Sequence, residues 1–229
     1  MLNINEVRMQ KKVIKRDVIL LMYNIVIVGA GGCGREVYLW AKDSFDFTKY
    51  QIKGFLSNNK SDLDNYNLKV GIIGDPDYYE IKENDRFLFA IGDIETKKRL
   101  VKKLKNKGAK FLTLIHPTAI VVNSAKIGEG VIISPFCLVS DNVQLDDFVM
   151  INAYVTCGHD AKVGKYSILS PYVALNGFVV LEDEVFLGTH STVIAHKTVG
   201  CQSKVSANSV VMRNVPPNRI VFGVPGRAI

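Results

Sequence analysis

A six-residue repeat occupies the second half of the chain and limits the folds that it can adopt. Residues 119–214 divide into sixteen blocks of six without insertion, and the third position is Val, Ile or Leu in fifteen blocks and Cys157 in the other. A helix repeats about every 3.6 residues and a strand about every 2, so neither produces this period. A coil with three short strands per turn does, because each block places one aliphatic residue inside and then turns a corner.

The repeat therefore predicts a parallel β-helix of about five turns. The fourth position of the blocks is rich in Gly, Ser, Asn and Asp, which tolerate tight turns, and we expect the corners there. An antiparallel β-domain would need turn signals about every 8–12 residues, so the sequence disfavours that alternative.

The segment before the repeat alternates strand-like and helix-like runs. We expect strands at residues 23–28, 52–56, 87–91 and 110–114, and helices at about 35–42 and 94–107. Asp93 and Thr96 can cap the second helix, Leu100 and Leu104 lie on its apolar face, and Gly108 can end it. Strands that alternate with helices predict a small parallel α/β unit.

The distribution of charge and cysteine excludes several classes of protein. The net charge of +7 comes from residues 1–21 (+3) and 95–110 (+7), while residues 22–94 carry −3 and residues 111–229 are neutral. A basic arm and one helix do not form a nucleic-acid groove, and we interpret the lysines of the helix as a solvated face. The four cysteines lack C-x-x-C spacing, and no apolar run approaches the roughly 20 residues of a membrane span. We expect a cytoplasmic protein without stable membrane insertion.

A glycine-rich loop follows the first expected strand and opens the first helix. Residues 29–34 read Gly-Ala-Gly-Gly-Cys-Gly, a context in which backbone N–H groups can approach a phosphate. A dinucleotide site would also need an acidic residue about 20 positions later, but the second strand ends in Ser57-Asn58, so NAD binding is disfavoured. A loop kept for tight packing alone is the other interpretation.

The order of these segments resembles the NeuD/PglD-type sugar acetyltransferases. The resemblance rests on the glycine loop, residues 90–93 (AIGD) and 114–119 (LIHPTA), the repeat with His159-Asp160, and the closing GVPGR at 223–227. It implies a Rossmann-like nucleotide-sugar-binding domain at residues 22–116, a left-handed parallel β-helix acetyltransferase domain at 117–229, and an N-terminal extension at 1–21. It also implies a homotrimer that transfers acetyl from acetyl-CoA to a nucleotide-linked amino-deoxysugar in surface glycan biosynthesis.

The resemblance assigns candidate binding residues. The nucleotide-sugar substrate would contact Gly31, Gly32, Cys33, Ser57, Asn58 and Gly92, and acetyl-CoA would contact Gly177, Thr189 and Ala207. Three positions depart from the family pattern, because relatives have His at Cys33, carboxylates at Ser57-Asn58 and, in some, His at Ile168. The nucleotide is therefore left open.

The catalytic candidates lie at a corner of the repeat. His159 can take a proton near neutral pH, and the carboxylate of Asp160 can orient the imidazole and raise its basicity. Gly177 follows three blocks later, so it should stack against His159 and could offer its N–H to an oxyanion. We expect His159 to deprotonate the attacking amine directly, without an acyl-enzyme.

Three alternatives accompany this hypothesis. His159, His190 and His196 invite comparison with the zinc-binding γ-carbonic anhydrases, but their spacing differs from that family, and we expect no metal. An O-acetyltransferase acting on sialic acid or another surface sugar would use a similar base. A non-catalytic nucleotide-sugar-binding trimer is the third alternative.

Overall fold

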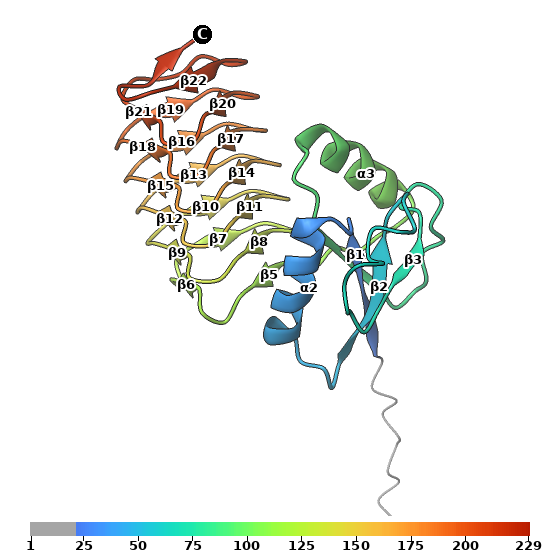
Figure 1. The fold of residues 1–229 in the computed structure, drawn as a ribbon. Helices are drawn as coiled ribbons and strands as arrows, with labels where there is room; N and C mark the ends of the chain where they lie inside the picture. The colour runs from blue at the N-terminus through green and yellow to red at the C-terminus, as the bar shows by residue number, and fades with distance from the viewer. Residues whose placement is uncertain (1–21) are drawn as a thin grey trace, which may run out of the picture.

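The computed structural model describes residues 22–229, which form an α/β unit beside a long β-helix (Figure 1). The expected extension at residues 1–21 lies outside the described residues. Within residues 22–229, no helix combines the length and the hydrophobicity that crossing a membrane requires.

The α/β unit is built on a four-stranded parallel sheet in the order β3-β2-β1-β4. Its elements are β1 (Tyr23–Val28), α2 (Gly32–Ser44), β2 (Tyr50–Leu56), β3 (Ile72–Gly74), β4 (Asp85–Phe89) and α3 (Ile94–Asn106). Helix α3 begins as predicted, because the Asp93 carboxylate accepts a hydrogen bond from the Thr96 N–H at 2.8 Å. Its Leu100 and Leu104 are buried.

Two elements differ from the sequence expectation. Strand β3 was not expected, and residues 110–114 do not form a strand of the α/β sheet. Phe111 makes only an isolated bridge to Phe87, whereas β5 (Leu114–Ile115) pairs with β8 (Ile132–Ile133) of the β-helix. The chain thus leaves the α/β sheet and starts the β-helix within a few residues.

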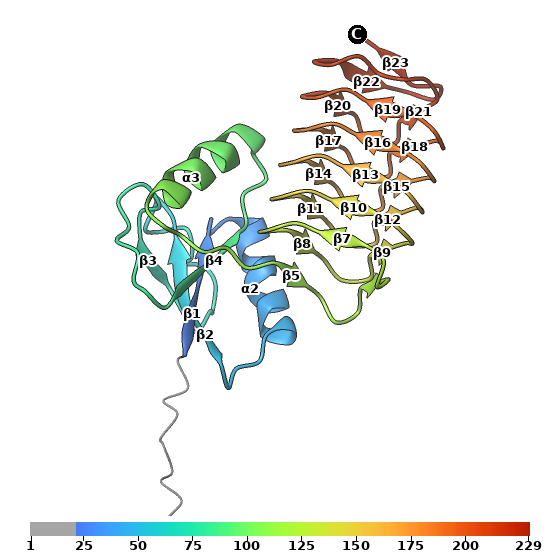
Figure 2. The same cartoon turned by 180° about the vertical axis from the view of Figure 1, so that it is seen from behind.

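Each of the sixteen blocks contributes one two-residue strand, as the repeat predicts, and the strands stack into three parallel sheets (Figures 1 and 2). The first sheet contains β5, β8, β11 (Met150–Ile151), β14 (Ile168–Leu169), β17 (Phe186–Leu187), β20 (Lys204–Val205) and β22 (Ile220–Phe222), with β23 (Arg227–Ala228) antiparallel at its end. The second contains β6 (Ile120–Val121), β9 (Leu138–Val139), β12 (Thr156–Cys157), β15 (Ala174–Leu175), β18 (Thr192–Val193) and β21 (Val210–Val211). The third contains β7 (Lys126–Ile127), β10 (Gln144–Leu145), β13 (Lys162–Val163), β16 (Val180–Leu181) and β19 (Thr198–Val199). The fold is a left-handed parallel β-helix whose third-position residues, Cys157 included, line the core.

The corners turn at the sixth position of the blocks, not at the fourth. Every sixth residue from Phe136 to Asn208 has a φ of 55–64°, the left-handed region, although none of them is glycine. Aromatic rings at these positions stack on the ring one turn away, as in the column Phe136, Tyr154, Tyr172 and His190, whose centroids are 4.6–5.1 Å apart. Stacking between turns offsets the cost of the backbone conformation.

The two parts share a buried junction. The outward side chains of Ile132, Met150 and Ile168 on the first sheet belong to the same core cluster as Ile25 and Val37 of the α/β unit. Helices α2 and α3 both face this sheet (Figure 2).

One lysine of α3 does not belong to the solvated face that the sequence suggested. Lys97 is 1% exposed, and its Nζ donates a hydrogen bond to the carbonyl of Phe148, a corner residue of the β-helix, at 2.8 Å. Burial lowers the pKa of this ammonium to about 8, against a smaller opposing effect of Cys33.

Candidate active site

His159 and Asp160 form a hydrogen-bonded pair at the corner between β12 and β13. The His159 Nδ1 lies 3.0 Å from the Asp160 Oδ2, and the His159 side chain is 59% exposed. With the Nδ1 proton directed to the carboxylate, Nε2 is the free basic nitrogen. The corner therefore exposes a basic nitrogen with a fixed orientation on the surface of the β-helix.

Gly177 packs against the face of the His159 ring. A Cβ built on Gly177 would lie 2.6 Å from Cε1 and 2.7 Å from Nε2 of His159. The backbone φ of Gly177 is not in the left-handed region, so the glycine is needed here for space and not for its torsion angle. Any side chain at this position would displace the imidazole.

Asn142 completes the corner and was missed in the sequence. Its Nδ2 donates to the Asp160 Oδ1 at 2.7 Å, and this bond, followed by the bond from His159, holds the pKa of Asp160 below its usual range. Asn142 occupies the sixth position three blocks before Asp160, so the 18-residue register of the turns could have found it. Both bonds favour the ionised form of the Asp160 carboxylate.

The expected acetyl-CoA residues are split between two corners. Thr189 and Ala207 lie one turn apart at the corner that precedes the second sheet, where the Asn208 N–H donates to the Thr189 carbonyl at 2.9 Å. Gly177 lies at the opposite edge of that sheet, after β15. One chain therefore does not gather the three residues around a single point.

The glycine loop separates into packing positions and open positions. Gly29, with a φ of 102°, and Gly34 face each other so closely that a Cβ on Gly34 would overlap the Gly29 carbonyl. Gly31 and Gly32 are exposed, and an added Cβ would meet nothing closer than the Arg35 guanidinium at 3.9 Å. Packing thus explains two glycines, while the other two leave the N-terminal N–H groups of α2 accessible.

Cys33 faces inward from the same turn. Its Sγ lies 3.8 Å from the Met150 sulfur on β11, and burial raises the pKa of the thiol to about 11, although the nearby Lys97 opposes this. A neutral, enclosed thiol packs the loop against the β-helix and is a poor nucleophile.

A carboxylate, that of Asp62, lies at the carboxyl end of β2, where the sequence predicted none. Ser57 is buried, and its Oγ donates to the Asp62 Oδ2, while the Asn59 Nδ2 donates to the other oxygen of Asp62 at 2.7 Å. Asn58 is exposed beside this loop. Asp62 therefore lies where sequence reasoning found no acid, because the loop folds back by five residues.

An arginine near the loop was also missed. The Arg35 guanidinium in the first turn of α2 lies 3.6 Å from the ring centroid of Tyr66, and residues 22–229 contain no carboxylate in ion-pair contact with it. A cation stacked on an aromatic ring keeps its donors free for an anion.

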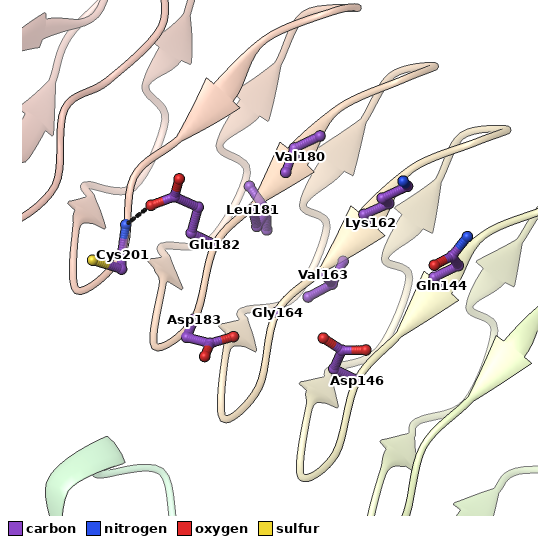
Figure 3. Close-up of a pocket in the computed structure, with 10 residues that line it drawn as sticks. All are labelled: Gln144, Asp146, Lys162, Val163, Gly164, Val180, Leu181, Glu182, Asp183 and Cys201. Carbon is purple, nitrogen blue, oxygen red and sulfur yellow. Dashed lines mark hydrogen bonds between the residues drawn. The ribbon is translucent and has the colours of Figure 1, made fainter.

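The two halves of the candidate site lie on different sides of the β-helix. Cys33 contacts β11 in the first sheet, whereas His159 lies between the second and third sheets. The outer face of the third sheet carries a shallow groove of about 450 Å³ lined by residues such as Gln144, Asp146 and Lys162 (Figure 3). In this groove Glu182 accepts the Cys201 N–H at 2.8 Å, and none of the expected site residues lines it.

His190 lies at a different corner from His159, whereas His196 lies two turns along the same corner, with the Phe178 ring between it and His159. The His190 ring stacks on Tyr172 and the His196 ring on Phe178, at two different corners. Residues 22–229 contain no cluster of three or more His, Cys, Asp or Glu side chains able to hold a metal ion. His116 lies at the start of the β-helix, where its Nδ1 is 2.8 Å from the Thr118 Oγ1.

Comparisons with known proteins agree with this architecture. Residues 24–104 match the family model of the PglD N-terminal domain. The chain is also similar to the structure of PerB from Caulobacter crescentus in complex with CoA and GDP-perosamine, at 28% identity and a TM-score of 0.80, covering 90% of this chain and 97% of that one. The chain therefore resembles the NeuD/PglD-type sugar acetyltransferases, both in its N-terminal unit and in its overall fold.

Curated relatives of the chain match over shorter segments. A GDP-perosamine N-acetyltransferase of Escherichia coli O157:H7 is 32% identical over 74 residues, which is 32% of this chain and 34% of that protein. A UDP-N-acetylbacillosamine N-acetyltransferase of Bacillus subtilis strain 168 is 49% identical over 47 residues, or 20% and 22% of the two chains. The matched segments thus span about a third or less of these relatives.

Proposed function

We propose that this protein is an acetyl-CoA-dependent N-acetyltransferase that acts on a nucleotide-linked amino-deoxysugar in the cytoplasm, during surface glycan assembly. The observation that carries the proposal is the His159–Asp160 pair above Gly177. Relatives named for GDP-perosamine and UDP-N-acetylbacillosamine, and a neighbour that binds CoA, support the class of substrates.

His159 acts as the general base. The sugar amine attacks the thioester carbonyl, and the proton lost from nitrogen moves to the His159 Nε2 while Asp160 holds Nδ1–H. The Gly177 N–H donates to the developing oxyanion. When the intermediate collapses, the C–S bond breaks and the imidazolium returns its proton to the CoA sulfur, so no acyl-enzyme forms.

The open end of the glycine loop holds the substrate phosphates. Gly31 and Gly32 contribute N–H groups at the start of α2, Cys33 closes the turn, and Arg35 adds a positive charge. Ser57, Asn58 and Gly92 lie at the ends of β2 and β4 on either side of β1, next to the nucleotide.

The active unit is a homotrimer. The glycine loop and His159 lie on different sides of one β-helix, so a second copy must bring its His159 corner to the nucleotide sugar. The split between Gly177 and the pair Thr189 and Ala207 supports the same arrangement, with acetyl-CoA lying between copies. A monomer in light scattering would contradict it.

The test is release of CoA from acetyl-CoA across UDP-, dTDP-, GDP- and CMP-linked sugars, each with and without a free amine. We expect turnover only with a free amine. Turnover on hydroxyl sugars alone would make the protein an O-acetyltransferase, and binding without any turnover would make it a non-catalytic nucleotide-sugar-binding protein.

A further inference from the structure

A cavity of about 390 Å³ lies between the start of α3 and the first sheet of the β-helix. Gly92, Asp93, Ile94 and Glu95 line one side, and Glu184, Phe186, Gln202 and Lys204 line the other. The residues of the β-helix come from two successive turns of the same column, because β17 pairs with β20. We call this space the junction cavity.

The junction cavity lies just beyond the end of β4, the strand next to the one that leads into the glycine loop. Residues 92–95 follow β4, the strand paired with β1, and a Cβ on Gly29 would lie 2.7 Å from the Ala90 carbonyl. Strands β2 and β3 lie on the other side of β1, so the space between the ends of β1 and β4 is where the strand order reverses. Ligands of open α/β sheets bind at this position.

Glu184 is held in place with one oxygen free. Its Oε2 accepts from the Lys98 Nζ at 2.8 Å and from the Gln202 Nε2 at 3.0 Å, while Oε1 has no partner among residues 22–229. Burial raises the pKa of Glu184, but the bonds from Lys98 and Gln202 outweigh burial and keep the pKa below its usual range. An ionised acceptor therefore faces the cavity with its position fixed by α3.

Each side of the cavity also contributes one apolar side chain. Ile94 and Phe186 are half-buried and pack on the same core cluster as the junction of the two parts. Apolar side chains beside fixed polar groups suit a ring that carries hydroxyls on its edge and C–H groups on its face. The volume also falls within the usual range of small-molecule sites, about 300–1,000 Å³.

We propose that the junction cavity binds the sugar ring of the nucleotide sugar, with Glu184 and Gln202 hydrogen-bonded to its hydroxyls and Phe186 against its face. The proposal rests on the proposed function and adds to it that this chain's own β-helix recognises the sugar. The phosphates lie on the glycine loop, and the acetyl group reaches the sugar from the His159 corner of another copy.

The test compares Gln202→Ala with the unmodified protein in calorimetric titrations with GDP-perosamine, with GDP alone, and with the other members of the nucleotide-sugar panel and their nucleotides. Gln202 is exposed, and its removal leaves the Lys98–Glu184 ion pair intact. We expect the Kd for the nucleotide sugar to rise about tenfold, the effect of one lost hydrogen bond, and the Kd for the nucleotide alone to stay unchanged. Gln51→Ala, at the far end of β2, is the matched control.

Glu184→Ala should raise the Kd for the nucleotide sugar further, again without changing the Kd for the nucleotide. Equal losses for the two ligands, or no loss in either variant, would overturn the sugar site while leaving the proposed function intact. If the unmodified protein binds no member of the panel, both proposals fail.

Discussion

The β-helix and the α/β unit are held together by different kinds of contact. In the β-helix each contact recurs every 18 residues, so a side chain meets its equivalent in the next turn, as Tyr154 meets Tyr172. In the α/β unit the contacts that matter occur once, such as Asp62 with Ser57 and Arg35 with Tyr66. Because its contacts recur, the β-helix can change one residue without losing its fold. A single corner can therefore carry catalytic residues while the other turns maintain the structure.

The largest expected effect tests whether corner histidines are equivalent. His159→Ala should lower kcat by about 10²–10⁴-fold, because the attacking amine then has no base. His190→Ala is the matched control, since His190 occupies another corner and stacks on Tyr172; its kcat should stay within a few fold. Steady-state CoA release measures both, and near-normal turnover in His159→Ala would refute the assignment of the base.

A glycine from each region provides the next comparison. Gly177→Ala places a methyl group 2.6 Å from the His159 Cε1, so the imidazole must move, and we expect kcat to fall by about 10²-fold. Gly71→Ala in the α/β unit meets nothing within 4 Å and should leave kcat unchanged. The melting temperatures of both variants, measured together with kcat, separate a shifted imidazole from a damaged turn. Unchanged kcat in Gly177→Ala would show that the ring position is not critical.

The repeat allowed most of the β-helix to be predicted from the sequence. The sixteen strands follow from the spacing of aliphatic residues, and even Asn142 could have been found by counting three blocks back from Asp160. The corner conformation could not be read from composition, because Phe and Tyr rarely adopt a positive φ, and the rings that stack on them here come from neighbouring turns. The repeat predicts where each residue lies in the β-helix. It does not predict the stacking between turns that stabilises the corner conformation.

The α/β unit resisted prediction where tertiary contacts override local pattern. Ser57-Asn58 offered no acid, yet the following loop returns Asp62 to the end of β2. Residues 110–114 resemble a strand of the α/β sheet, but Leu114 pairs with the β-helix. Lys97 lies in a basic run that suggests a solvated face, yet the fold buries it and bonds its Nζ to the Phe148 carbonyl of the β-helix.

The smallest expected effect concerns Lys97, the residue that joins the two regions. Its pKa is about 8 in the folded protein, mainly because burial disfavours the charge, while an unfolded lysine titrates near 10.5. Between these values the unfolded chain keeps a proton that the folded chain has released, so the stability of the wild type rises with pH. Relative to Lys97→Met, the wild type should gain about 1.4 kcal/mol in unfolding free energy from pH 7 to pH 9.

Urea unfolding of both proteins at the two pH values measures this difference, and the titration of groups common to the two proteins largely cancels. Lys102→Met, an exposed lysine on the same helix, is the control and should follow the wild type at both pH values. A constant difference between wild type and Lys97→Met would mean that Lys97 keeps its proton when buried. In that case the hydrogen bond to the Phe148 carbonyl would stabilise the ammonium by more than burial destabilises it. The junction would then hold a buried charge.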